Sequence, residues 1–112
     1  MPELSMTYDE LFEHHRMRAT VQHALIGEIT PQMRAISAQG APRSIDVWFY
    51  IDGPVSEELQ SDLNAGARDL VLDEYQDTPD FDAHFHFVRC DHPAEILCAG
   101  TWIYGRKEYR KA

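Results

Sequence analysis

One stretch in the middle of the chain constrains the fold more than any other. From residue 45 to 52, apolar residues alternate with aromatic or acidic ones, a period of two that is typical of a strand with two differently used faces. A Gly-Pro pair at 53–54 ends this pattern, and the hydroxyl of Ser56 can cap a helix that starts next. Glu57 and Glu58 then occupy the first turn, where the helix dipole favours negative charge. The stretch therefore predicts a strand, a tight turn and a packed helix.

The predicted helix carries an apolar stripe beside an acidic one. Its apolar positions are those expected of an amphipathic helix laid on a sheet: Leu59, Leu63, Ala67 and Leu70. At 100° per residue, Glu58, Asp62, Asp69 and Asp73 fall within about 60° of arc next to this stripe. Carboxylates so placed repel each other, and a basic partner would relieve that repulsion. Together with Glu57, these acids are the predicted partner-binding residues.

The remaining elements follow from caps, turns and alternation. Thr7 and Glu10 form a capping box that starts a first helix, which ends near Gly27. Its helical period is expected to run through Tyr8, Leu11, Phe12, His15, Ala19, Gln22 and His23. Strands are predicted at 29–39, 45–51, 81–89 and 101–104, with a hairpin turn at 40–42.

These elements predict a single α+β domain over residues 1–112. The order is α-β-β-α-β-β, and short runs joined by turns favour a mostly antiparallel four-stranded sheet with both helices on one face. Two layers result. Residues 1–5 are expected to be loose, and residues 106–112 form a basic tail.

The charge distribution restricts the partners. The chain has a net charge of −9, and the span 52–82 holds ten acids against a single base, Arg68, so it accounts for the whole excess. An acidic face repels nucleic acid and attracts basic partners at long range. A plain solvated surface is the alternative and the commoner case for a run of charge. No membrane-length apolar run or signal peptide is present, which predicts a cytoplasmic protein without a membrane partner.

The second face of the predicted sheet is rich in aromatic residues. If the other face meets the helices, this one carries Trp48, Tyr50, His84, His86 and Trp102. Trp48 and Tyr50 are therefore candidate anchors for a partner. The alternatives are burial under the chain's own loops, or pairing with a second copy, which would make the protein a self-associating structural module. We expect a monomer or a weak homodimer.

Histidines supply the competing enzymatic interpretation. His84 and His86 have i, i+2 spacing and share one side of a strand, with Cys90 and His92 nearby, so a zinc site or an acid–base pair is conceivable. No closed zinc motif and no nucleophile motif accompanies them. We therefore expect no enzyme, no metal and no cofactor. Cys90 and Cys98 are expected to be reduced thiols.

Four sequence blocks resemble a known family. They are ALIGEITPQMRAIS (24–37), FYIDGPVSEE (49–58), VRCDHP (88–93) and YGRKE (104–108). The blocks are similar to those of small bacterial immunity proteins that accompany secreted toxins of the polymorphic or contact-dependent growth inhibition class. The resemblance implies a non-enzymatic antitoxin that binds and neutralises one toxin domain, often a nuclease. The resemblance marks no toxin-contacting residue, so the acids and aromatics above remain the predicted contact sites. Through them, the protein is expected to cover a basic surface of the toxin.

Overall fold

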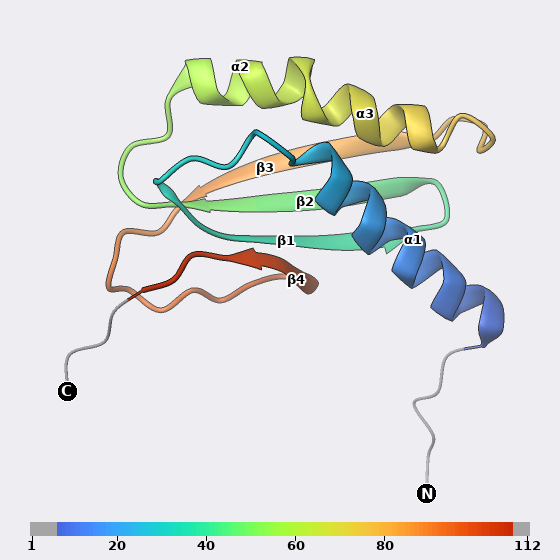
Figure 1. The fold of residues 1–112 in the computed structure, drawn as a ribbon, viewed down its shortest axis with the longest axis horizontal. Coiled ribbons are helices and arrows are strands. Elements are labelled where there is room, and N and C mark those ends of the chain that lie inside the picture. The colour runs from blue at the N-terminus through green and yellow to red at the C-terminus, as the bar shows by residue number, and fades with distance from the viewer. Residues whose placement is uncertain (1–6, 109–112) are drawn as a thin grey trace, which may run out of the picture.

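The computed structural model describes residues 7–108 as an α+β fold. The elements are α1 (Tyr8–Ala24), β1 (Met33–Ala41), β2 (Ser44–Ile51), α2 (Glu57–Ala65), α3 (Ala67–Glu74), β3 (Asp82–Arg89) and β4 (Thr101–Gly105). The strands form one four-stranded sheet in the order β3-β2-β1-β4. In Figure 1, α1 crosses in front of this sheet while α2 and α3 run along its β3 side. No helix within the described range is long and apolar enough to cross a membrane.

The sheet is mixed, which corrects part of the prediction. β1 pairs antiparallel with both β2 and β4, but β2 and β3 are parallel. The reason is the helical connection between β2 and β3: it carries the chain back along the sheet, so Asp82 at the start of β3 lies beside Ser44 at the start of β2. A helix between two strands is the usual route to a parallel pair.

The second predicted helix is divided into two. Gly66 ends α2 and begins α3, so the element order is α-β-β-α-α-β-β instead of α-β-β-α-β-β. Leu63, Ala67 and Val71 are the buried positions, at intervals of four residues across the break. Leu70, which was predicted to lie on the apolar stripe, is 45% exposed. Val71 takes its place against the core.

The helices and one face of the sheet enclose a single apolar cluster. The inward positions of β2 are the four predicted from alternation: Ile45, Val47, Phe49 and Ile51. From α1 the cluster receives Met17, Val21 and Ala24. The predicted face of α1 is therefore wrong, because Tyr8 is 90% and Phe12 65% exposed. The capping box of Thr7 with Glu10 is confirmed.

The connection between β3 and β4 covers part of the other face. β3 and β4 lie at opposite edges, so residues 90–100 must cross β2 and β1 to join them. The backbone N–H of Ala99 donates to the Tyr50 hydroxyl at 2.9 Å, and Tyr50 is only 4% exposed. Gly100 has φ +69°, and a Cβ there would collide with the carbonyl oxygen of Ala38. The connection therefore lies directly against the sheet.

The start of the first strand moves, and two predictions fall on residues outside the description. β1 begins at Met33 instead of Ile29, because the backbone N–H of Met33 closes a turn onto Thr30. Residues 1–5, predicted to be loose, and the 109–112 part of the basic tail lie outside the described residues.

Candidate functional site

Five exposed carboxylates form the candidate site on the outer side of α2 and α3. We call this set the acidic ridge: Glu57, Glu58, Asp62, Asp69 and Asp73, all of them exposed. The helices are positioned by Ser56, whose side chain accepts a hydrogen bond from the backbone N–H of Leu59 at 3.1 Å. The buried stripe on the opposite side of both helices turns the acids toward solvent.

The one base on these helices does not neutralise the acidic ridge. Arg68 turns away toward β3, where its Nε donates to the carbonyl oxygen of Ala83 at 2.7 Å and its Nη2 donates to Asp82 Oδ1 at 2.7 Å. Across residues 7–108, none of the ion pairs involves a ridge carboxylate. The ridge is therefore an uncompensated negative surface.

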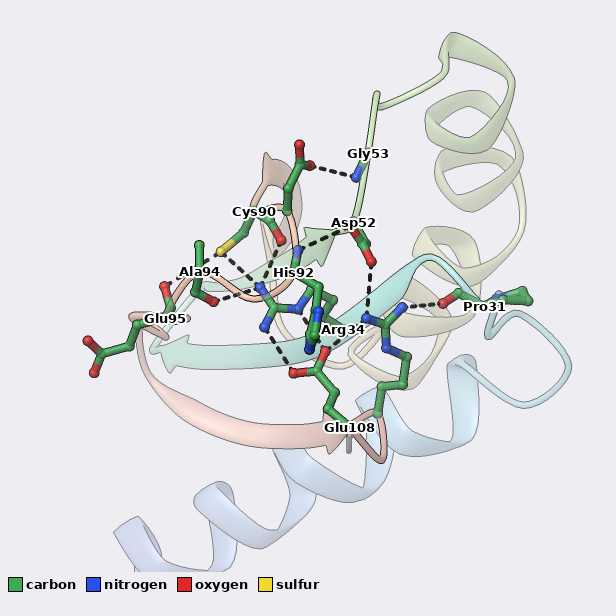
Figure 2. Close-up of polar contacts among 11 residues, drawn as sticks. Pro31, Arg34, Asp52, Gly53, Cys90, His92, Ala94, Glu95 and Glu108 are labelled. Carbon is green, nitrogen blue, oxygen red and sulfur yellow. Dashed lines mark hydrogen bonds and ion pairs between the residues drawn. The ribbon is translucent and has the colours of Figure 1, made fainter. Parts of the chain in front are cut away.

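Four arginines outside these two helices are also paired with carboxylates of the chain: Arg16, Arg34, Arg89 and Arg106. The most buried is Arg34, which is 4% exposed and contacts both oxygens of Glu108, at 2.7 and 2.9 Å (Figure 2). Its Nη1 also donates to the carbonyl oxygens of Cys90 and Ala94 at 2.9 and 2.8 Å. The hydrogen bond from Arg34, assisted by Arg106, lowers the pKa of Glu108 to about 2.

Arg106 extends this arrangement to the end of β2. It contacts Asp52 at 3.1 Å and Glu108 at 2.9 Å, and it donates to the carbonyl oxygen of Pro31 at 2.7 Å. The backbone N–H of His92 and the Arg106 side chain both bind Asp52 and lower its pKa. We call this set the arginine clamp: Arg34, Asp52, Arg106 and Glu108.

The arginine clamp explains what the four sequence blocks do. Each block contributes a member or a direct partner of it: Arg34 from the first, Asp52 from the second, the 90–92 backbone from the third, and Arg106 with Glu108 from the fourth. In Figure 2 these segments converge on Arg34 and Glu108. The blocks that carry the family resemblance thus hold the chain together, and the acidic ridge lies mostly outside them.

The structure does not bring the predicted aromatic anchors to the acidic ridge. Trp48 and Tyr50 lie on the sheet face opposite the helices, since Val47 and Phe49, which alternate with them along β2, face the core. Trp48 is half-buried and stacks on His86 with ring centroids 5.3 Å apart. The expectation that Tyr50 is exposed is wrong, because the 90–100 connection covers it.

The histidines of β3 are paired with separate carboxylates. His86 Nε2 lies 2.8 Å from Asp46 Oδ1, and His84 Nε2 lies 3.7 Å from Asp82 Oδ2. Cys90 and Cys98 are free thiols, and burial raises the pKa of Cys98. In the described part of the chain, no three histidine, cysteine, aspartate or glutamate side chains lie close enough together to hold a metal ion. The pairings give both imidazoles a structural explanation.

Sequence reasoning missed a second acidic region, at the first turns of α1. Asp9, Glu10 and Glu13 lie across a groove from Asp77, which follows α3. Asp9, Glu10 and Glu13 lie in the part of the sequence where acids and bases cancel, so the net charge did not reveal this region. The acidic first turn of α1 was the one local signal, and only the tertiary contact of α1 with α3 places it near Asp77.

The comparisons with known proteins give one family. The family model described as "MafI2 immunity protein" matches residues 14–108. No curated protein matches the chain.

Proposed function

Since the chain belongs to the MafI2 immunity protein family, we propose that it binds one cognate toxin domain and neutralises it through the acidic ridge. The ridge covers a basic surface of the toxin, and the toxin is a nuclease. The protein itself performs no catalysis in this account. It acts by occupying a surface that the toxin needs for its substrate.

The chemistry of nucleic-acid binding supports a nuclease as the target. A nuclease carries lysines and arginines where it meets the phosphate backbone. Carboxylates that project from a helix can reach those same side chains and form charge-assisted hydrogen bonds with them. Opposite charges also speed the encounter of the two proteins, which suits an inhibitor that must act before the toxin does.

One observation carries the proposal: the ridge acids are exposed and make no ion pair within residues 7–108, whereas five arginines of the same chain are paired with other carboxylates. Like charges on one helical surface cost the free protein some stability. A basic partner removes that cost. None of these five arginines pairs with a ridge carboxylate, so the ridge remains available to an external partner.

The first test is a pull-down from cells that also carry the neighbouring genes, with the chain as bait and elution by salt. A single stoichiometric basic domain, released at high salt and identified by mass spectrometry, is the expected result. A bait that recovers no partner and carries bound zinc would contradict the proposal and favour a site at His84 and His86.

The second test reverses the charge of the ridge. Changing Glu58, Asp62, Asp69 and Asp73 to lysine should slow association with the toxin by about tenfold or more and reduce its dependence on salt. A matched pair of single variants provides the control: Asp69→Lys on the ridge and Glu95→Lys on the 90–100 connection, both exposed. Equal binding by the quadruple variant and the wild type would remove the ridge from the account.

A further inference from the structure

A groove lies where α1, the β1–β2 turn and the segment after α3 meet. Its volume is about 660 Å³, within the range of roughly 300–1,000 Å³ that is typical of pockets for small ligands. In Figure 1 these three segments gather at the right-hand end of the molecule, whereas the start of β1 and the end of β2 lie at the left-hand end. The groove therefore belongs to the helical side and is separate from the 90–100 connection.

The lining of the groove combines an apolar floor with an acidic rim. The apolar contacts come from both the core and the turns: Met17, Ile45, Tyr75, Phe81, Ala41 and Pro42. Tyr75 and Phe81 stack in parallel with their ring centroids 4.1 Å apart, so each ring covers one face of the other. The rim carries four carboxylates: Asp9, Glu10, Glu13 and Asp77.

Arg16 shows which chemistry this groove accepts. Its guanidinium carbon lies 4.3 Å from the centroid of the Tyr75 ring, a cation–π geometry. The same group contacts Asp77 at 3.1 Å and Glu13 at 3.8 Å. The hydrogen bond from Arg16 lowers the pKa of Asp77. One arginine of the chain is thus already held by the Tyr75 ring and by two carboxylates of the rim.

The rim keeps negative charge beyond what Arg16 balances. Among the residues lining the groove, Arg16 is the one arginine or lysine against four carboxylates. Glu10 also receives the backbone N–H of Thr7 in the capping box, but Asp9 makes no ion pair with any residue from 7 to 108. The groove therefore attracts a second cation and has room for its aliphatic stem.

Building on the proposed function, we propose that the groove receives an arginine side chain of the toxin, with its stem on the apolar floor and its guanidinium at the Asp9 and Glu13 side of the rim. Arginine fits better than lysine because its planar head pairs with carboxylates in a fork. The acidic ridge speeds the encounter, and the groove slows dissociation, because side chains desolvated in a pocket hold complexes together.

The contribution of the groove can be tested with the purified toxin domain by filling the groove. Ala41→Trp places an aromatic ring in it from an exposed strand end and leaves every charge in place. The dissociation rate should rise about tenfold with little change in the association rate. Glu13→Gln should weaken binding by about threefold, and Glu95→Gln, outside both surfaces, provides the control. Thermal melting checks that each variant is folded.

A peptide titration tests the groove even if the toxin account fails. The probe is the capped tripeptide Ala-Arg-Leu, with Ala-citrulline-Leu as its neutral counterpart, added to isotope-labelled protein. The arginine peptide should shift the amide resonances of Gly40, Ala41 and Thr78 in a saturable way at roughly millimolar concentration. The citrulline peptide should not, and Ala41→Trp should abolish the shifts.

The two measurements separate the failure of each proposal. Toxin binding that depends on the ridge but is unchanged by Ala41→Trp would overturn the groove and leave the proposed function standing. Peptide shifts in the groove of a protein that binds no toxin would overturn the proposed function and retain the arginine site. Peptide shifts confined to α2 and α3, or no shifts at all, would overturn the groove.

Discussion

The arginine clamp and the acidic ridge use the same kind of charge in opposite ways. In the clamp, Arg34 is 4% exposed, and its partner Glu108 has a pKa of about 2. On the ridge, Asp62 and Asp69 are exposed and have no ion-pair partner within residues 7–108. The clamp connects β1 to the 90–100 connection and to the segment after β4, whereas the ridge carboxylates form no ion pair with any other part of residues 7–108.

This contrast predicts that the clamp contributes to the stability of the fold and the ridge to toxin binding. A buried ion pair that loses one partner leaves a charge without compensation, which is costly. Exposed like charges cost little, and they keep their full attraction for an external cation. Changes in the clamp should therefore act on the free energy of unfolding, and changes in the ridge should act on toxin binding.

The largest effect is expected from Arg34→Leu. It removes one of the two arginines that pair with Glu108 and the donor to two carbonyl oxygens, so the free energy of unfolding should fall by about 4 kcal/mol. Urea unfolding measures this, with the exposed Arg89→Leu as the matched control, which should leave the midpoint unchanged. Equal midpoints for the two variants would contradict the structural role of the clamp.

Acid should weaken the clamp in a defined pH window. The pKa of Glu108 is about 2 in the folded chain against 4.5 ordinarily, so its stabilising contribution is complete above pH 4.5 and is lost as the pH falls toward 2. The contribution is on the order of 3 kcal/mol. Unfolding of the wild type and Glu108→Gln should differ at pH 7 and converge near pH 2. A difference that is constant with pH would refute this assignment.

A ridge variant should improve stability while it weakens binding. Asp62→Asn with Asp73→Asn breaks the like-charge i, i+4 pairs of the ridge, so the melting temperature should rise by about 2 °C. Removal of two negative charges should slow association with the toxin severalfold. Calorimetry and association kinetics on one sample measure both. Loss of stability in this variant would show that the ridge acids support the fold.

The smallest effect on binding is expected at Trp48. This residue lies on the sheet face opposite the ridge and stacks on His86. Trp48→Leu should leave the toxin dissociation constant within about twofold of the wild type. A loss of tenfold or more would place the toxin on the aromatic face instead and break the comparison on which the account rests.

Local patterns in the sequence predicted most elements but not their long-range geometry. The alternation of β2 and the caps at Thr7 and Ser56 depend on neighbouring residues, and the structure confirms them. The direction of β3 depends on how the α2–α3 connection returns along the sheet, which no local period encodes. The prediction of the buried face of α1 was wrong for a similar reason: Tyr8 and Phe12 have helical spacing, but both side chains are exposed to solvent instead of packing on the sheet.

In the candidate site, too, the features set by local spacing could be predicted, and those set by tertiary packing could not. Spacing on a helix was sufficient to place the ridge acids on an exposed side, although the break at Gly66 was not foreseen. The orientation of Arg68 toward Asp82 and the burial of Tyr50 under the 90–100 connection arise from tertiary packing. In and around the arginine clamp, Arg34 binds Cys90 and Glu108, which lie 56 and 74 positions away along the chain, so the members of the clamp could be recognised as blocks but not as a network.

The most direct test of the account is hydrogen–deuterium exchange of the protein alone and in complex with the toxin domain. The account predicts slower exchange over residues 57–74 and at the 40–42 turn, with residues 90–105 unchanged. Slower exchange confined to the 90–100 connection and β4, with α2 and α3 unchanged, would contradict it and place the toxin on the opposite face of the sheet.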